Sequence, residues 1–308
     1  MVPLRTGDVG EPEWSPGHPS LSHGERRFRR RIRVTEISVR FWGVRGSVPC
    51  PGRETVRYGG NTACVEVRCG DRLVIFDAGT GLRALGHALA AGPPGLAADI
   101  FISHCHIDHI GGLPFFEPCY MPANQIRIWA GSLLSEQRLA DVARILMSAP
   151  LFPSGEGVFK AKITFCDFQS GDVLKPYPDL TLRTVPLAHP GGATGYRLEY
   201  RSRSVAYVTD TEHSPGRLDP AVLALAEAAD LLIYDCNYTD EEFAGHVGRG
   251  HSTWQEGVRI AEAARAQRLA IFHHDPNHDD EFLDGVKARA TQCHPGAIVA
   301  AEGLIVSL

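Results

Sequence analysis

A four-layer αββα sandwich, with helices outside two central sheets, is the fold that this 308-residue sequence predicts. Short apolar or alternating segments bounded by Gly, Asp or Pro recur in both halves of the chain, as strands do. Segments with helical periodicity accompany the strands in each half. Hydrophobic residues make up 44% of the chain and charged residues 22%, so it can bury a sizeable core. The expected class is α+β or α/β.

The N-terminal segment differs from the rest of the chain. Residues 1–33 are rich in Pro, Gly and Ser and end in the basic run RRFRRRIR. Such a composition buries little apolar surface, which predicts a disordered or loosely attached leader. The basic run could contact anionic lipid or nucleic acid, but a solvated leader is the favoured interpretation. The folded domain is expected over 34–308.

In the first half, a strand is expected in VTEISVRFWGV, where Ile37, Val39 and Phe41 share one face. Further strands are expected in ACVEVRC, RLVIFDAG, ADIFISH and QIRIWAG, and a helix in RALGHALAAG. LSEQRLADVARILM is expected to form an amphipathic helix, whose apolar side consists of Leu134, Leu139, Val142, Ile145 and Leu146. This helix either forms one wall of a functional site or packs on the surface; the sequence leaves both open.

The second half repeats this rhythm. Strands are expected in KITFCDF, LTLRTVPLAH, TGYRLEYRS, SVAYVTD, LLIYDCN, RLAIFHH and GLIVSL. One helix is expected to begin with Asp219 as its N-cap and Pro220 at its first position. A second is expected to begin near Ser252, which has capping-box spacing to Gln255. A third is expected in DDEFLDGVKARATQ.

Composition narrows the classes of partner. The net charge is −5 and the sequence pI about 6.3, which does not favour nucleic acid, although a local basic patch remains an alternative. The eight cysteines form no CxxC pair and several lie in apolar segments, which indicates reduced thiols. No apolar run approaches the ~18–20 residues of a membrane span. The N-terminus lacks the plan of a secretory signal, so a cytoplasmic protein without a membrane partner is expected.

The most informative segment is SHCHIDH, residues 103–109, directly after the apolar strand ADIFI. A loop at the end of a strand can turn several side chains toward one point. The imidazoles of His104 and His106 suit one borderline-soft ion, and Asp108 with His109 suits a second ion nearby. The segment therefore predicts a site for two metal ions.

This HxHxDH motif, preceded by the turn DAGTG at residues 77–81, resembles the metallo-β-lactamase superfamily, and the resemblance spans about residues 36–308. It implies the αββα sandwich of that superfamily. It also implies three further metal ligands, which match TVPLAHPGG, VAYVTDTE and LAIFHHDP. By this resemblance one metal is held by His104, His106 and His189, the other by Asp108, His109 and His273, and Asp210 bridges them.

Two assignments within this set have alternatives. His274 is adjacent to His273, and strand alternation points neighbouring side chains in opposite directions, so only one is expected to bind. His273 is chosen because it matches the ligand position of the superfamily motif. Asp77 is expected to support a ligand histidine from outside the metal sphere; an Asp that merely forms the turn is the alternative.

Four segments narrow the resemblance to phosphodiesterase-like members: GVRGSVP, RYGGNTACVEV, YDCNYTDEEF and GRGHSTWQEG. The last resembles the closing region of ribonuclease Z and of the phosphonate-pathway cyclic phosphodiesterase, where the His of a Gly-His-Ser/Thr donates a proton. That residue is His251 here, with a helix-capping His as the alternative. The resemblance implies a phosphodiesterase acting on a small phosphodiester such as a cyclic nucleotide. A metal-bridging hydroxide oriented by Asp108 and Asp210 would attack phosphorus, and His251 would protonate the leaving alkoxide.

Several questions stay open at the level of sequence. Arg45, Asn61 and Asp235 lie in the same segments without an assigned role; Arg45 could hold a phosphate or form a structural salt bridge. Zn is the expected metal, with Mn and Fe as alternatives, and the resemblance implies a homodimer.

Alternative functions are tRNA 3′ processing, hydrolysis of a lactone, lactam or thioester, and a non-catalytic metal-bound sensor. The first is less favoured because ribonuclease Z usually carries a protruding basic arm, and no Gly- and Lys-rich insertion is present in this sequence.

Overall fold

The computed structural model describes residues 36–133, 137–153 and 155–308. The chain divides into two units, residues 1–34 and 35–308, and every element described here belongs to the second. The leader expected over 1–33 lies outside the described residues, as does Leu134 of the expected amphipathic helix.

The first sheet contains seven described strands in the order β14-β1-β2-β3-β4-β5-β6. β14, β1, β2 and β3 pair antiparallel, whereas β3, β4, β5 and β6 pair parallel. Ile37, Val39 and Phe41 of β1 are fully buried on one face, as the alternation predicts. The strand bounds are β1 Ile37–Gly43, β2 Cys64–Cys69, β3 Arg72–Phe76, β4 Ala97–Ile102, β5 Gln125–Ala130, β6 Lys162–Asp167 and β14 Ile305–Ser307.

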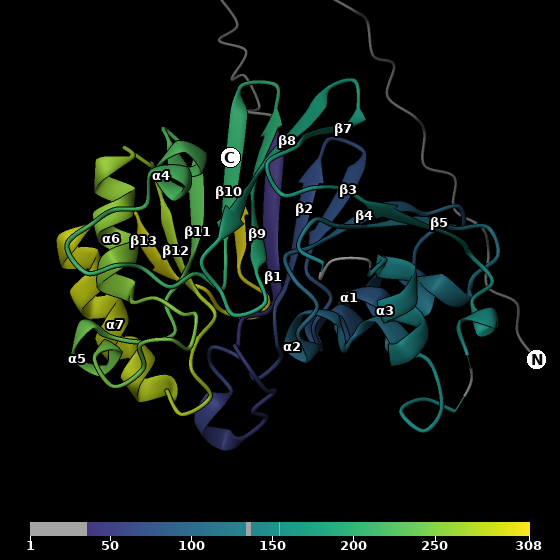
Figure 1. The fold of residues 1–308 in the computed structure, drawn as a ribbon, viewed down its shortest axis with the longest axis horizontal. Coiled ribbons are helices and arrows are strands. Elements are labelled where there is room, and N and C mark those ends of the chain that lie inside the picture. Colours follow the sequence, from purple (N-terminus) through teal and green to yellow (C-terminus); the bar gives the residue numbers. More distant parts are fainter. Residues whose placement is uncertain (1–35, 134–136, 154) are drawn as a thin grey trace, which may run out of the picture. The chain divides into compact units, whose positions relative to one another are not determined.

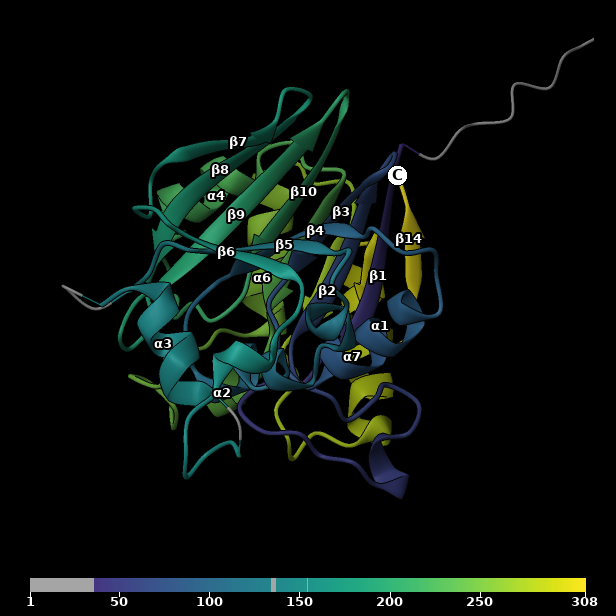
Figure 2. The same ribbon diagram turned by 90° about the vertical axis from the view of Figure 1, so that its right-hand side faces the viewer.

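The second sheet also contains seven described strands, in the order β13-β12-β11-β10-β9-β8-β7. β7 to β10 pair antiparallel and β10 to β13 pair parallel, so the two sheets share the same pattern of strand directions. Figure 2 shows the long strands β8, β9 and β10 lying beside one another. The bounds are β7 Val173–Tyr177, β8 Leu180–Leu187, β9 Ala193–Tyr200, β10 Arg203–Val208, β11 Leu231–Asp235, β12 Leu269–Phe272 and β13 Ala297–Val299.

Helices cover the outer face of each sheet. One buried cluster joins the second sheet to α4, α6 and α7, and another joins the first sheet to α1 and α3 (Figure 1). A third cluster contains side chains from both sheets and fills the space between them. These three cores confirm the αββα sandwich. The helix bounds are α1 Gly81–Ala90, α2 Ile107–Ile110, α3 Leu139–Leu146, α4 Pro220–Ala226, α5 Asp240–Phe243, α6 Trp254–Ala263 and α7 Asp280–Cys293; short 3-10 turns are η1 Arg53–Thr55, η2 Leu113–Phe115, η3 Glu117–Tyr120 and η4 Glu156–Val158.

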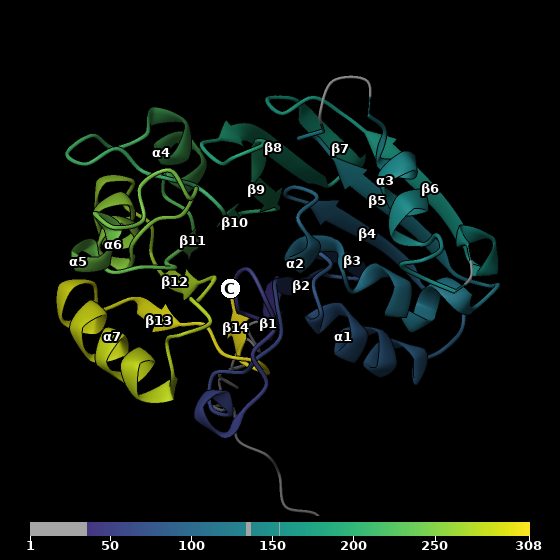
Figure 3. The ribbon, with the colours of Figure 1, turned by 60° about the horizontal axis from the view of Figure 1, so that its bottom comes forward.

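Each sheet contains one strand at which the direction of pairing changes from antiparallel to parallel. These strands are β3 and β10, which are directly followed by Asp77 and by Thr209-Asp210. In open α/β sheets, ligands usually bind outside the carboxyl ends of the strands. Asp77 and Asp210 both have a positive φ, 58° and 55°, which turns each chain sharply after its strand. Figure 3 shows α2, which follows β4, between the two sets of strands at this end.

Most expected elements are confirmed, and one cap is wrong. Asp219 caps α4 by accepting a hydrogen bond from the Ala221 amide, with Pro220 at the first helical position. The cap of α6 is Thr253, whose side chain accepts from the Glu256 amide, and not Ser252. The hydroxyl of Ser252 lies near the ring of His213 instead. Two strands, β7 and β13, were not expected, because their patterns are short and only weakly alternating.

The cysteines agree with the expectation of reduced thiols, and only some of them lie in the core. All eight cysteines are free, and Cys64, Cys69, Cys119 and Cys236 are buried. Among the described residues, the helices are too short or too polar to cross a bilayer.

Candidate metal centre

Three histidines form the first donor group: His104, His106 and His189. His104 and His106 follow β4, and His189 follows β8. The Nε2 of His104 lies 2.8 Å from the Nδ1 of His106, which lies 3.1 Å from the Nε2 of His189. Donor atoms of all three lie within 4.8 Å of one another, as the ligands of one ion do.

Asp108, His109 and His273 form the second donor group, also within 4.8 Å of one another. Asp108 and His109 lie on α2, and His273 follows β12. The two imidazole Nε2 atoms are 3.2 Å apart, and Asp108 Oδ2 lies 3.1 Å from that of His109 and 3.4 Å from that of His273. The Ser47 amide donates to the same Asp108 oxygen at 2.7 Å and so holds the carboxylate in place.

Asp210 lies between the two groups and offers one oxygen to each. Its Oδ1 is 3.9 Å from His104 Nε2 and 3.8 Å from His189 Nε2. Its Oδ2 is 3.2 Å from His109 Nε2 and 3.3 Å from His273 Nε2. The Thr209 hydroxyl donates to Oδ2 at 2.7 Å. This is the placement that a bridging carboxylate requires.

The protonation pattern of these residues fits bound cations. His189 Nδ1 must donate its hydrogen to the carbonyl of Gly250 at 2.8 Å, and His109 Nδ1 lies 2.8 Å from an Asp77 carboxylate oxygen. In each neutral ring the Nε2 atom therefore carries a lone pair directed into the centre. There it faces other imidazoles and the carboxylates of Asp108 and Asp210. Lone pairs that face each other repel unless a cation or proton lies between them, so the donor set suits two metal ions.

Neighbouring carboxylates and imidazoles shift the pKa values of His109 and Asp210 in the direction that favours their charged forms. Burial by itself lowers the pKa of His109, but the carboxylates of Asp210, Asp108 and Asp77 raise it well above its usual value. Burial by itself raises the pKa of Asp210, but His273, His109 and His104 hold it well below its usual range. The centre thus keeps its carboxylate charged and attracts positive charge to the ring nitrogens.

Asp77 supports the centre from behind His109. The side chain is fully buried, and its Oδ2 also accepts hydrogen bonds from Ser103 Oγ at 2.8 Å and Tyr207 Oη at 2.7 Å. Its Oδ1 accepts from the Ser103 amide at 2.6 Å. Asp77 lies in the turn after β3 and also contacts the ring of His109. Such partners fix the tautomer of a metal-binding histidine.

His273 and His274 differ in what their rings face. His273 has a positive φ of 61° and directs Nε2 into the second donor group. His274 is fully buried, and its Nε2 lies 2.8 Å from the carbonyl of Ala300. Burial lowers the pKa of His274 to about 3, so its ring is a neutral donor to that carbonyl. The side chain of Asn237 donates to the carbonyl of His273 at 2.9 Å and stabilises the turn.

His251 lies at the edge of the centre and has a partner that the sequence analysis left unassigned. Its Nδ1 is 3.0 Å from Asp235 Oδ2 and 3.7 Å from Asp210 Oδ1. Burial opposes a charged ring, but Asp235 and Asp210 raise the pKa of His251 to about 9. Asp235 ends β11, which lies between β10 and β12 in the sheet. A polar residue at the carboxyl end of each neighbouring parallel strand is the sequence signal that could have identified Asp235.

The same geometry allows a second role for His251. His251 and Asp235 form, with Asp210 and His273, another set of donors within 4.8 Å of one another. His251 is thus placed either to hold a proton beside the metals or to contribute a ligand, and only its effect on metal content separates the two.

The segment that carries His251 is anchored to the segment that follows Asp210. The carboxylate of Glu212 accepts hydrogen bonds from the amides of Gly248 and Gly250, the shortest at 2.8 Å. His213 Nδ1 lies 2.8 Å from the hydroxyl of Ser252. Gly250 needs its positive φ of 84° and its lack of a side chain, because a Cβ there would lie 2.3 Å from His189 Nδ1. The backbone at Gly250 therefore packs directly against the ring of His189 and holds it in place.

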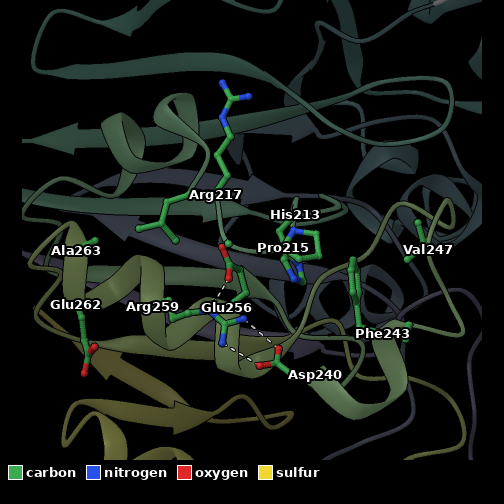
Figure 4. Close-up of a pocket in the computed structure, with 13 residues that line it drawn as sticks. His213, Pro215, Arg217, Asp240, Phe243, Val247, Glu256, Arg259, Glu262 and Ala263 are labelled. Carbon is green, nitrogen blue, oxygen red and sulfur yellow. Dashed lines mark hydrogen bonds and ion pairs between the residues drawn. The ribbon is translucent and has the colours of Figure 1, made fainter.

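A large cavity adjoins this anchored segment. It measures about 990 Å³ and includes His213, Phe243 and Val247 in its wall. Figure 4 shows Arg259 between Asp240 and Glu256 on one side of this cavity, at 2.8 Å and 2.6 Å. His213 stacks on Phe243 with 4.1 Å between ring centroids. Because these three charged groups pair with one another, they stabilise this part of the wall.

Arg45 has a structural role, but its partners are backbone carbonyls and not the carboxylate of a salt bridge. It is fully buried and donates hydrogen bonds to the carbonyls of Gly59, Asp275 and His278. Its guanidinium thus joins the segment after β1 to the turn after His274. Asn61 is likewise structural and donates to Glu302 at 3.1 Å.

A smaller cavity of about 290 Å³ opens beside the first donor group. His104 and His106 form part of its wall, and Val142 and Ile145 of α3 form another part. Of the two alternatives for the amphipathic segment, the structure therefore supports a wall of the site. Leu139 and Ala143 on the same helix are buried, so α3 also packs against the sheet.

Comparison with known proteins places this geometry in a family. The sequence pattern described as "Beta-lactamase superfamily domain" matches residues 72–274. The chain is 26% identical over 320 residues to a protein named ribonuclease Z from Halobacterium salinarum, with 87% of this chain and 96% of the relative covered.

Two solved structures share the fold. The metallo-β-lactamase fold protein YhfI from Bacillus subtilis superposes with a TM-score of 0.65 and 20% identity, covering 88% of this chain and 99% of the other. A diphosphatase from the PhnP family gives 0.65 and 18%, covering 88% and 98%. The chain therefore belongs to the family described as the beta-lactamase superfamily domain. It is a metallohydrolase with the metallo-β-lactamase fold, and its metal site consists of histidine and aspartate residues.

Proposed function

We propose that this protein is a phosphodiesterase that uses two divalent metal ions, with Zn as the preferred ion, and cleaves a small phosphodiester. One observation carries the proposal: Asp210 offers one oxygen to each donor group, 3.8–3.9 Å from the first and 3.2–3.3 Å from the second. The name ribonuclease Z, borne by relatives along most of the chain, supports a phosphodiester as the substrate class.

In this proposal each donor group holds one ion. His104, His106 and His189 would hold one, Asp108, His109 and His273 the other, and Asp210 both. Two ions bound in this way supply Lewis-acid neutralisation of phosphoryl charge and the means to ionise water near neutral pH.

The remaining steps belong to side chains of this protein. Asp108, held by the Ser47 amide, and Asp210 place carboxylate oxygens where they can orient an attacking water. His251 is held by Asp235, so its ring is positioned to give a proton to the leaving alkoxide. General acids of this kind contribute ~10²–10⁴-fold to the rate.

The first experiment measures hydrolysis of bis(4-nitrophenyl) phosphate by protein whose metal content has been counted. Turnover should require about two metals per chain, and Asp210→Ala should lose metal and activity together. Turnover that persists in metal-free protein would contradict the proposal. Two bound metals without turnover on any phosphodiester would instead favour an enzyme that hydrolyses a lactone, lactam or thioester, or a non-catalytic metal-bound sensor.

A second variant tests His251. His251→Ala should keep both metals and slow the cleavage of a diester with an alkoxide leaving group more than one with 4-nitrophenolate, which leaves without a proton. Loss of a metal in this variant would instead identify His251 as a ligand.

Processing of tRNA 3′ ends is the second candidate, because relatives bear the name ribonuclease Z. A filter-binding assay with precursor tRNA distinguishes tRNA processing from hydrolysis of a small diester. Tight binding and cleavage of the tRNA would favour the nuclease over an enzyme for small diesters.

A further inference from the structure

The small cavity beside His104 and His106 has a chemical character that narrows the substrate. Resting on the phosphodiesterase function proposed above, we infer that this cavity holds an uncharged apolar or aromatic substituent of the diester and excludes a second phosphate. The argument rests on the position, size, lining and charge of the cavity.

Its position ties the cavity to the first donor group. The described residues of its wall are His104, Cys105, His106, Ser132, Leu133, Gln137, Val142, Ile145, Pro190, Gly191 and Gly192. Two of these are metal-binding candidates, and Pro190 directly follows a third, His189. A substituent on a phosphorus held at the metals would therefore extend directly into this space.

Its size fits one ring system. A volume of about 290 Å³ lies just below the ~300–1,000 Å³ typical of small-molecule sites. A phenyl ring or a single nucleobase can enter such a space. The cavity has no room for more than one such group, so a larger substrate could place only one ring there.

Its lining is apolar on the side of α3. Leu133, Val142 and Ile145 lie together there, and Ile145 is 60% exposed to solvent. Apolar side chains that gather in one cavity beside a reactive centre gain free energy when a ligand covers them. Ser132 and Gln137 add groups that can form hydrogen bonds without charge.

Its charge argues against a second phosphate. Neither Lys nor Arg is among the residues that the structure places in this wall. Recognition of phosphate usually relies on Arg or Lys, and an unpaired anion in an apolar cavity loses hydration without compensation. The metal ions would be occupied by the phosphate that reacts. A neutral substituent is therefore favoured over a diphosphate or an extended polyanion.

The test compares three diesters that share the 4-nitrophenol leaving group and differ in the second substituent: phenyl, methyl and 2-phosphonoethyl. With metal-loaded protein, kcat/KM should be at least about tenfold higher for phenyl than for methyl, since even one methylene in an apolar pocket changes it ~10–200-fold. The phosphonoethyl diester should be the poorest. Equal values for phenyl and methyl, or preference for the phosphonoethyl diester, would overturn the inference.

Ile145→Lys places a cation on the cavity wall at a position exposed enough to leave folding intact. It should reduce the phenyl preference at least about tenfold and improve the relative rate with the phosphonoethyl diester. Ile305→Lys, on β14 at the opposite edge of the first sheet and 55% exposed, is the matched control and should change neither. An unchanged preference in Ile145→Lys would contradict the assignment.

A binding measurement separates failure of this inference from failure of the proposed function. Calorimetry should show phenylphosphonate binding to the metal-loaded protein at least about tenfold more tightly than methylphosphonate, with the difference lost in Ile145→Lys. If none of the diesters is hydrolysed but this difference is found, the proposed phosphodiesterase activity is wrong. The assignment of the cavity to an apolar substituent is then still supported. Equal binding of the two phosphonates would refute the cavity assignment whatever the activity.

Discussion

At the scale of single residues, the direction of a side chain decides its role more than its chemical type. His273 and His274 are adjacent and chemically identical, yet one faces His109 at 3.2 Å and the other a backbone carbonyl at 2.8 Å. The superfamily resemblance pointed to His273, and the structure places that ring among the donors. The alternation argument assumed that the strand continues, but β12 ends at Phe272 and His273 adopts a positive φ.

This difference makes a prediction for metal content. His273→Ala should lower bound metal from about two ions per chain to about one, because the second donor group loses a ligand. His274→Ala should retain both ions but reduce the free energy of unfolding by about 1–3 kcal/mol, because the buried carbonyl of Ala300 loses its partner. Elemental analysis and denaturant unfolding measure the two effects. The reverse pattern of metal loss would show that His274 is the ligand.

Asp235 allows a prediction about positioning. Asp235→Asn keeps the shape of the side chain but removes the charge that holds the ring of His251. Metal content should stay the same, while kcat falls about 10–100-fold for an alkoxide leaving group, a part of the ~10²–10⁴-fold that a general acid contributes. The fall for 4-nitrophenolate should be much smaller. Equal losses for both leaving groups would mean that Asp235 does not act through a proton donor.

At the scale of elements, the ends of strands and the segments that follow them build the site. β3, β4, β8, β10 and β12 are followed by Asp77, the HxHxDH motif, His189, Asp210 and His273, and β11 ends at Asp235. The segment from Gly248 to Ser252 lies outside the strands, and Glu212 and His213 are among the residues that hold it.

Removing that support should affect turnover more than folding. In Glu212→Ala the amides of Gly248 and Gly250 lose their acceptor, so the His251 segment should move more freely and kcat should fall about tenfold, a small part of the ~10²–10⁴-fold that a well-placed general acid contributes. Amide hydrogen exchange should rise over 246–251. Glu262→Ala, an exposed carboxylate on α6, is the matched control and should leave both unchanged. Unaltered exchange in Glu212→Ala would show that the segment has other anchors.

At the scale of the whole domain, the metal centre lies where the two sheets and their loops meet, so metal binding and folding are coupled. Donors from both sheets, most of them buried, converge there, and their lone pairs repel one another unless a cation or proton lies between them. Chelation should therefore lower Tm, and added Zn should restore it. At a concentration 100 times Kd the gain is ~2.7 kcal/mol. A Tm that is insensitive to chelator in protein shown to have lost its metal would contradict this coupling.

The sequence by itself determined the local patterns and the chemistry of the donors. Strand alternation, the Asp219 cap and the HxHxDH motif depend on neighbours along the chain, so they can be read without a structure. The choice of Thr253 over Ser252 as cap shows the limit, because both have suitable side chains and only packing against His213 and Tyr234 engages Ser252.

Only the tertiary structure decided which distant groups meet. The pairing of Asp235 with His251, the position of Asp210 between two donor groups, and the apolar wall of α3 beside His104 depend on strand order and on sharp turns after the strands. These contacts join residues far apart in sequence. No local periodicity encodes them, because they arise from how strands, helices and loops pack in the folded domain.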